Sequence, residues 1–170
     1  MEIPFIKYIA DTQHYDDVLA RAVSVKHTLW IGTAHIKDVY VKSGMSAVSL
    51  LVVFDKLVKK NVAIRLIHAK EPGPIFREEH KKFPSLWSSM EMTLCPRVHF
   101  KLMIFDMETA YIGSANLTGA GIGMKSGQKR NFEAGILTNE PSLVNAADEV
   151  WRGKFCEKCG RKSYCGGPIR

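Results

Sequence analysis

Six positions of the sequence carry residue types that can do chemistry together, at the spacing H-x-K-x4-D-x6-G-S-x-N. They are His99, Lys101, Asp106, Gly113, Ser114 and Asn116. A neutral imidazole is a competent nucleophile toward phosphorus. An ammonium, an amide and a hydroxyl group are the donors that hold phosphate oxygens and stabilise the charge of a pentacoordinate transition state. The group therefore predicts nucleophilic substitution at phosphorus.

A strand and a hairpin are expected to bring these residues together. Residues 98–105 alternate strictly between two sets of side chains, which predicts a strand with two different faces. One face carries Val98, Phe100, Leu102 and Ile104, and the other carries His99, Lys101, Met103 and Phe105. A turn at 106–109 and a second strand at 110–113 would return the G-S-x-N segment to the vicinity of the histidine.

This motif resembles the HKD signature of the phospholipase D superfamily, in which H-x-K-x4-D is followed by G-S-x-N. The stretches His99–Asp106 and Tyr111–Thr118 match every fixed position. Further along the chain, Asn131–Glu133 resembles the downstream acidic segment of the family. Together with the elements upstream of the motif, the resemblance covers most of residues 12–151.

The resemblance implies a role for each matched residue. His99 would attack phosphorus and form a phosphohistidine intermediate, and Glu133 would accept a hydrogen bond from the other ring nitrogen of that histidine. Asp106 is expected to hold the hairpin. The chemistry of the family needs no metal ion. The residues expected to bind the phosphate are Lys101, Ser114 and Asn116.

The family builds its active site from two HKD motifs, one histidine acting as nucleophile and the other as general acid. This chain contains one copy. The resemblance therefore implies a homodimer in which two-fold symmetry brings the two His99 side chains into one shared site. A further histidine, His35, follows an expected strand and either points into the same cleft or is an ordinary histidine at a strand end.

The order of the expected elements predicts an α/β fold. A buried strand at 29–34, an amphipathic helix at 47–60 and a β-branched strand at 62–67 imply a parallel pair with a right-handed crossover. The other expected elements are strands at 3–9, 91–94 and 132–138 and helices at 14–26, 75–83 and 141–151. They predict a mixed β-sheet flanked by helices on both faces, the phospholipase D-like αβα sandwich. We expect residues 1–151 to form the catalytic domain and residues 152–170 a small Cys-rich C-terminal tail.

The tail contains three of the four cysteines, Cys156, Cys159 and Cys165. Their spacing, C-x2-C-x5-C, with Cys95 as a distant fourth thiol, predicts a metal knuckle that holds structural zinc or an iron-sulfur cluster. The alternative is a tail with three reduced thiols. Four cysteines are too few for a disulfide scaffold and the N-terminus lacks a secretory signal, so we expect a cytoplasmic protein.

The chain of 170 residues has a formal net charge of +7, which favours a polyanionic partner such as nucleic acid. Most of the excess lies in residues 151–170, where six basic residues accompany one acidic residue. The segment 125–130, which includes Lys129 and Arg130, is the second place where we expect contacts with a phosphate backbone. No apolar run approaches the roughly 20 residues that a spanning helix needs, so no stable membrane insertion is expected.

Three function classes follow. A short chain with a single motif resembles the nuclease-type members of the family, which implies cleavage of DNA or RNA. A phospholipid phosphodiesterase or phosphatidyl transferase would need an exposed apolar loop, and the candidate segment, Phe83–Trp87, is short. A non-catalytic nucleic-acid-binding module is the third class, and the intact motif argues against it.

Overall fold

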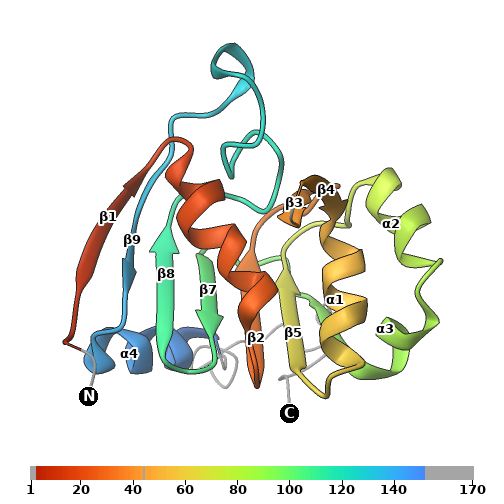
Figure 1. The fold of residues 1–170 in the computed structure, drawn as a ribbon, viewed down its shortest axis with the longest axis horizontal. Coiled ribbons are helices and arrows are strands. Elements are labelled where there is room, and N and C mark those ends of the chain that lie inside the picture. The colour runs from red at the N-terminus through yellow and green to blue at the C-terminus, as the bar shows by residue number, and fades with distance from the viewer. Residues whose placement is uncertain (1–2, 44, 152–170) are drawn as a thin grey trace.

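The computed structural model describes residues 3–43 and 45–151 of the chain. Figure 1 shows a central sheet with helical segments in front of it and behind it. Within the described residues the sheet has seven strands in the order β1-β9-β8-β7-β2-β5-β6, and β3 and β4 form a separate antiparallel pair. The strands are β1 (Ile6–Ala10), β2 (Thr28–Thr33), β3 (Tyr40–Ser43), β4 (Ser46–Ser49), β5 (Ala63–His68), β6 (Met90–Leu94), β7 (Lys101–Phe105), β8 (Thr109–Gly113) and β9 (Ala134–Thr138).

The helical segments connect these strands. They are the π-helical turn η1 (His14–Val18), the 3-10 helices η2 (Leu19–Ser24) and η3 (Gly127–Lys129), and the α-helices α1 (Leu50–Val58), α2 (Pro74–His80), α3 (Pro84–Ser89) and α4 (Pro141–Trp151). In the part of the chain that the structure describes, none of the helices has the length and apolar character needed to cross a bilayer.

The sheet is mixed. β2 and β5 are parallel, with Thr33 opposite His68, and β6 continues parallel on the outer side of β5. The other neighbours, β2-β7, β7-β8, β8-β9 and β9-β1, are antiparallel. The expected fold class and the expected parallel pair are therefore confirmed. The C-terminal ends of β2, β5 and β8 and the N-terminal ends of β7 and β9 lie along one edge, which we call the upper edge from its place in Figure 1.

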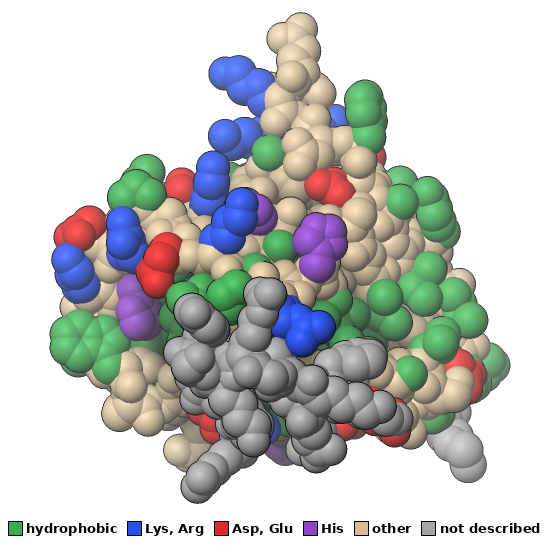
Figure 2. Space-filling model, turned by 180° about the vertical axis from the view of Figure 1, so that it is seen from behind, with side chains coloured by type: hydrophobic (Ala, Val, Ile, Leu, Met, Phe, Trp, Pro, Cys, Tyr) green, Lys and Arg blue, Asp and Glu red, His purple; other side chains and the backbone are tan. Residues whose placement is uncertain are grey.

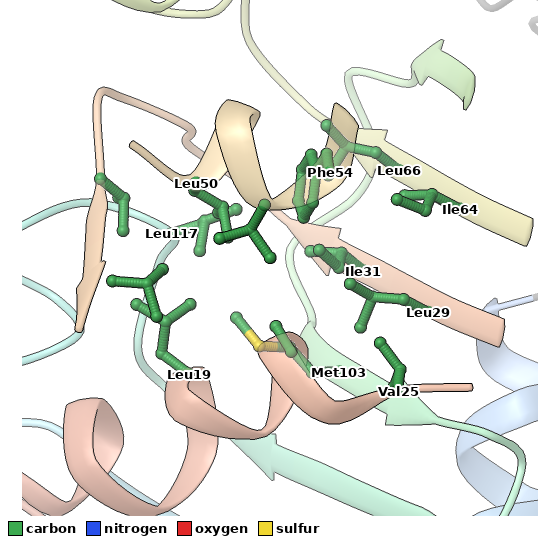
Figure 3. Packing of buried hydrophobic residues seen from close by; sticks show 14 of the residues in the cluster. Leu19, Val25, Leu29, Ile31, Leu50, Phe54, Ile64, Leu66, Met103 and Leu117 are labelled. Carbon is green, nitrogen blue, oxygen red and sulfur yellow. The ribbon is translucent and has the colours of Figure 1, made fainter. Parts of the chain in front are cut away.

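Each face of the sheet buries its own hydrophobic cluster. On one face, η2 and α1 pack against β2, β5 and β7 (Figure 3). Its labelled members include Leu19, Leu29, Ile31, Leu50, Phe54, Leu66 and Met103. On the other face α4 packs against β2, β7 and β8 through Trp30, Leu102, Ile104, Val144, Ala147 and Trp151. The expected alternation of β7 is confirmed, because successive residues of this strand belong to the two different clusters.

The chain before α1 differs from the expected helix at 47–60. Residues 46–49 pair with β3 as strand β4, and α1 begins only at Leu50. The hydroxyl group of Ser49 accepts a hydrogen bond from the backbone N–H of Leu51 at 3.3 Å. A serine at this N-cap position satisfies a donor that has no partner inside the helix, and it therefore fixes the start of α1.

Other element boundaries also differ from the expectations. The segment 14–26, expected to be one helix, consists of η1 followed by η2. Pro84, which directly follows the expected helix at 75–83, begins a separate helix, α3, because the fixed φ of proline suits the first helical turn. Strand β7 begins at Lys101 rather than at residue 98, and β9 begins at Ala134 rather than at residue 132.

Candidate active site

The register of β7 and β8 places His99, Lys101 and the G-S-x-N segment at the upper edge of the sheet. Lys101, the first residue of β7, lies opposite Gly113, the last residue of β8. His99 and Ser114 therefore leave the sheet from adjacent strands at the same edge. Both side chains belong to exposed residues, so a substrate can reach them.

Lys101 and His99 are in direct contact. The ammonium group of Lys101 donates a hydrogen bond to the backbone carbonyl oxygen of His99 at 2.7 Å, and it lies 3.5 Å from Nδ1 of the imidazole. Lys101 is only 8% exposed. A buried ammonium group is costly unless it is hydrogen-bonded or paired with an anion. The site thus holds a largely desolvated cation beside an accessible imidazole, which suits the binding of a phosphate group.

The side chain of Asn116 is held by the loop that follows β2. Its amide oxygen accepts a hydrogen bond from the backbone N–H of His35 at 3.1 Å. The hydroxyl group of Thr33 accepts from the N–H of Leu117 at 3.0 Å and donates to the carbonyl oxygen of His35 at 2.8 Å. Because its oxygen is engaged with the backbone, Asn116 retains its NH2 group to donate to a phosphate oxygen.

Ser114 is tied to the segment before β9. Its backbone N–H donates to the carbonyl oxygen of Ala134 at 2.9 Å, and its hydroxyl oxygen accepts from the N–H of Ala134 at 3.0 Å. The hydroxyl group donates to the carboxylate of Glu133, whose other oxygen accepts from the amide of Asn131 at 3.0 Å. Within the described residues, the hydrogen bonds of Glu133 are therefore to Ser114 and Asn131, and its expected bond to His99 is not among them.

Asp106 lies at the opposite end of β7 from the other motif residues. Its carboxylate accepts hydrogen bonds from the backbone N–H groups of Lys26, His27 and Thr28 at 2.7–3.1 Å. Burial alone would raise the pKa of this carboxyl group, but the backbone N–H groups of Thr28, Lys26 and His27 outweigh burial and lower it. Asp106 and Met107 adopt φ values of 53° and 58°, which turn β7 into β8. The structure thus gives Asp106 contacts that fix the start of β2.

The segment 119–130 projects above the upper edge of the sheet in Figure 1. Lys129 and Arg130, expected to contact a phosphate backbone, differ in their surroundings. Lys129 is exposed. The guanidinium group of Arg130 is paired with Asp11, with Nε 3.1 Å from Oδ1, and its side chain is 20% exposed. Arg130 therefore anchors this segment to the turn after β1 in the described structure.

His35 lies beside the motif residues. This is the first of the two alternatives that the sequence left open, the other being an ordinary histidine at a strand end. His35 is partly buried. Burial, followed by the charges of Lys70, Lys101, Lys37 and His99, lowers the pKa of His35. Both effects favour the neutral form of the imidazole. The sequence analysis did not identify Lys37 and Lys70 as residues that act on His35. Both were within reach of it, because they follow β2 and β5, which are parallel neighbours and end at the same edge of the sheet.

Tyr111 is a second residue that the sequence analysis passed over. Its hydroxyl oxygen accepts a hydrogen bond from the backbone N–H of Ala115 at 3.3 Å, directly beneath the G-S-x-N segment. Its ring and hydroxyl group fill the space where Gly113 and Gly135 lack a side chain, and a Cβ atom on Gly113 would lie 2.2 Å from the hydroxyl oxygen. Burial raises the pKa of this phenol, which stays protonated. A tyrosine two residues before the G-S pair, on the same face of β8, was the available signal.

The predicted metal ligands Cys156, Cys159 and Cys165 lie outside the described residues, as does the expected tail at 152–170. Cys95 is 7% exposed and packs in the same cluster as Trp30 and Trp151. Among the described residues, no group of three histidine, cysteine or acidic side chains is arranged to hold a metal ion. The tail site therefore stays a prediction.

A family model described as "Cardiolipin synthase, PLD-like domain" matches residues 18–152 of the chain. No curated protein matches the sequence at a significant level. Among solved structures, the chain is similar to NucT from Helicobacter pylori, with a TM-score of 0.64 and 12% identity over 97% of this chain and 99% of that chain.

Two other solved structures are similar over most of this chain. A phospholipase D family member, Nuc from Salmonella typhimurium, has a TM-score of 0.60 and 17% identity, covering 88% of this chain and 92% of that chain. A phosphatidylserine synthase from Haemophilus influenzae has a TM-score of 0.60 and 11% identity, covering 82% of this chain and 34% of that chain. At such low identity these likenesses show the fold alone.

Proposed function

The chain belongs to the phospholipase D superfamily, which acts on phosphodiesters, and we propose that it is a metal-independent nuclease that cleaves DNA or RNA through a phosphohistidine intermediate. The observation that carries this proposal is the arrangement at the upper edge. There the accessible imidazole of His99 adjoins the buried ammonium group of Lys101, and the amide of Asn116 is anchored to the backbone of the neighbouring loop. These groups supply a nucleophile and donors for phosphate oxygens.

The proposed reaction has two displacements at phosphorus. In the first, a ring nitrogen of His99 forms a bond to phosphorus while the bond from phosphorus to the leaving oxygen breaks, and the leaving oxygen takes a proton from a general acid. In the second, water attacks phosphorus, the nitrogen–phosphorus bond breaks, and the proton lost by water returns to that acid. Lys101 and Asn116, together with Ser114, stabilise the negative charge on the phosphate oxygens in both transition states.

The general acid is proposed to come from a second copy of the chain. The chain has a single HKD motif, and His99 is exposed at the sheet edge, where a two-fold axis can pair it with its symmetry mate. In this homodimer each His99 serves as nucleophile or as acid within one shared site. Glu133 is proposed to orient His99 when substrate displaces Ser114 from its carboxylate.

The donors at this site are an ammonium group, an amide and a hydroxyl group, which stabilise anionic charge directly. We therefore propose that no metal ion takes part in catalysis. The cysteines of the tail are proposed to hold a structural zinc ion or an iron-sulfur cluster instead, in a role separate from the reaction.

A phospholipid substrate is the second candidate. The matching family model is described as a cardiolipin synthase, PLD-like domain, and Ile75 and Trp87 on α2 and α3 are 59% and 61% exposed. Exposed apolar side chains of this kind can enter a lipid interface. The charges of Lys37 and Lys70, which act on His35 together with that of Lys101, favour a polyanionic substrate such as nucleic acid.

A substrate panel with a matched pair of variants tests the proposal. Purified protein is assayed on single-stranded DNA, single-stranded RNA, duplex DNA and phosphatidylglycerol vesicles. We expect the wild-type protein to cleave nucleic acid. In His99→Ala the cleavage rate should fall by a factor of at least about 10³. The affinity of this variant for the nucleic acid should be nearly unchanged. His27→Ala, which removes an exposed imidazole at the opposite end of β2, is the control and should keep full activity.

Cleavage of lipid but not of nucleic acid would replace the nuclease by the second candidate. Binding of nucleic acid with no cleavage of any substrate would indicate the non-catalytic module. Equal cleavage by wild type and His99→Ala would refute the assigned nucleophile.

A further inference from the structure

The loops that follow β2 and β5 are joined to each other at the upper edge. Because these strands are parallel and in register, both loops begin at the same edge. The backbone N–H of Gly73 donates to the carbonyl oxygen of Ile36 at 3.1 Å, and the carbonyl oxygen of Lys70 lies 2.8 Å from Nδ1 of the buried His68. The alkyl chain of Lys37 packs beside Gly73. The side chains of these two loops therefore share one region of the surface.

This region is electropositive. The charges of Lys37 and Lys70 both act on His35, together with those of Lys101 and His99, and they lower the pKa of that imidazole. Figure 2 shows histidine side chains beside lysine or arginine side chains near the middle of the face seen from behind.

Lys37 and Lys70 are both exposed. Across residues 3–43 and 45–151, neither forms an ion pair, whereas Lys7, Lys42, Lys59 and Lys81 each pair with a carboxylate. Two unpaired ammonium groups beside a neutral imidazole form a set of donors suited to an anion of more than one negative oxygen.

The region is also tied rigidly to the catalytic motif. The N–H of His35 donates to the side chain of Asn116 at 3.1 Å, and the N–H of Lys37 donates to the carbonyl oxygen of Leu117 at 3.0 Å. Ile36 and Leu117 form a parallel bridge between the same two segments. An anion held by these residues would therefore sit at a fixed place next to the one held by the motif.

We propose that His35, Lys37 and Lys70 form a second phosphate subsite, which binds the phosphate adjacent to the scissile one in a nucleic-acid strand. The subsite rests on the proposed function, because it has a role only beside a site that binds a phosphodiester. A nucleic-acid strand occupies both phosphate sites at once, while a substrate with a single phosphate leaves the second site empty. The subsite thus selects polymeric phosphodiesters through charge and spacing rather than through base contacts.

A comparison of two substrates tests the subsite. The double variant Lys37→Gln with Lys70→Gln is assayed on bis(p-nitrophenyl) phosphate, which has one phosphate, and on a single-stranded oligonucleotide. For the oligonucleotide we expect KM to rise about tenfold and the slope of log KM against log salt to fall by about one, since one phosphate contact is lost. Hydrolysis of bis(p-nitrophenyl) phosphate should not change.

Two control variants separate the subsite from a general charge effect. Lys56→Gln with Lys60→Gln removes two exposed charges near the C-terminal end of α1, far along the sheet from the upper edge, and should leave the salt slope unchanged. Lys37→Arg with Lys70→Arg keeps both charges and should retain most of the affinity for the oligonucleotide.

Three results would overturn the subsite. The first is an unchanged KM and salt slope for the oligonucleotide in the Lys37→Gln, Lys70→Gln variant. The second is an equal loss of activity on both substrates. The third is a variant that loses only its binding to phosphatidylglycerol vesicles. If the wild-type protein cleaves neither diester, the proposed function itself fails. That failure is distinguishable, since it does not depend on any lysine variant.

Discussion

The ammonium group of Lys101 lies 2.7 Å from the backbone carbonyl oxygen of His99 and 3.5 Å from a ring nitrogen of the same residue. The hydrogen bond to the carbonyl oxygen offsets part of the cost of burying this cation. A phosphate group brought to the imidazole would offer the ammonium group a charged partner, which forms a stronger hydrogen bond. In the proposed mechanism, the contact therefore couples the position of the nucleophile, His99, to the group that stabilises the transition state, Lys101.

Asp106→Asn is expected to destabilise the fold. The variant replaces a carboxylate that accepts hydrogen bonds from the N–H groups of Lys26, His27 and Thr28 with an amide that has one acceptor oxygen. Bonds of this charged kind contribute roughly 1.5–3 kcal/mol, so we expect a loss of that order in the free energy of unfolding at pH 7. Urea denaturation of both proteins measures it.

The difference in stability between wild type and Asp106→Asn should depend on pH. The pKa of Asp106 is lowered in the folded state, so the carboxylate stabilises the fold fully above its unfolded-state pKa of about 3.9. This stabilisation is lost as the pH falls through the lower folded-state pKa. The difference between wild type and Asp106→Asn should be constant from neutral pH down to about pH 4 and should shrink below it. A difference that does not vary with pH would show that the charge is irrelevant.

Gly32→Ala is expected to disturb the nucleophile from a distance. A Cβ atom on Gly32 would lie 2.2 Å from Cε2 of Phe100, the residue between His99 and Lys101. The ring must move, at a typical cost of about 1–3 kcal/mol in stability, and we expect kcat to fall about tenfold as the histidine shifts. Adding Phe100→Leu relieves the overlap and should restore part of kcat. A fully active Gly32→Ala would contradict the positioning of His99 through Phe100.

A defined heterodimer tests the shared active site. Wild-type and His99→Ala chains with different affinity tags are coexpressed, and the mixed dimer is isolated on both tags. If each reaction needs both histidines, the mixed dimer should be nearly inactive, while a mixed dimer of wild type and His27→Ala keeps full activity. Half of the wild-type activity would show that each chain has an independent site, and a fully active monomer in sedimentation experiments would exclude the dimer.

Cleavage in the presence of excess EDTA tests metal independence. We expect the initial rate to remain within about twofold of the rate without chelator, because the donors at the site are groups of the protein itself. A slow loss of cleavage activity, accompanied by a fall in thermal stability, would reflect removal of a structural metal ion from the cysteines. Immediate loss that added Mg²⁺ restores would count against the proposed chemistry.

Much of the fold and the placement of the motif could be predicted from the sequence. The alternation of residues 98–105 predicted the two faces of β7, because the side-chain period of a strand is independent of what packs on it. The hydrophobic pattern of residues 29–67 predicted the parallel pair. The chain between these strands was harder, since Ser49 caps α1 and leaves residues 46–49 to pair with β3. A single polar residue, Ser49, separates the apolar residues of β4 from those of α1, so periodicity alone did not separate the two elements.

The contacts that hold the site could not be predicted in the same way. The N–H of His35 and the side chain of Asn116 are 81 positions apart, and no local pattern indicates which loops meet at a sheet edge. Ser114 and Glu133 are closer in the chain, but their hydrogen bond depends on where β9 begins. Tyr111 has the pattern of an ordinary core residue. Its contact with Gly113 becomes visible only when the two residues are placed on the same face.

Trapping of the covalent intermediate tests the central claim most directly. Wild-type protein is mixed rapidly with an oligonucleotide, quenched in base to preserve phosphoramidate bonds, digested and examined by mass spectrometry. The account predicts an acid-labile phosphoryl adduct on the peptide that contains His99, absent from the His99→Ala protein. Turnover without any adduct, or an adduct on a residue other than His99, would contradict it.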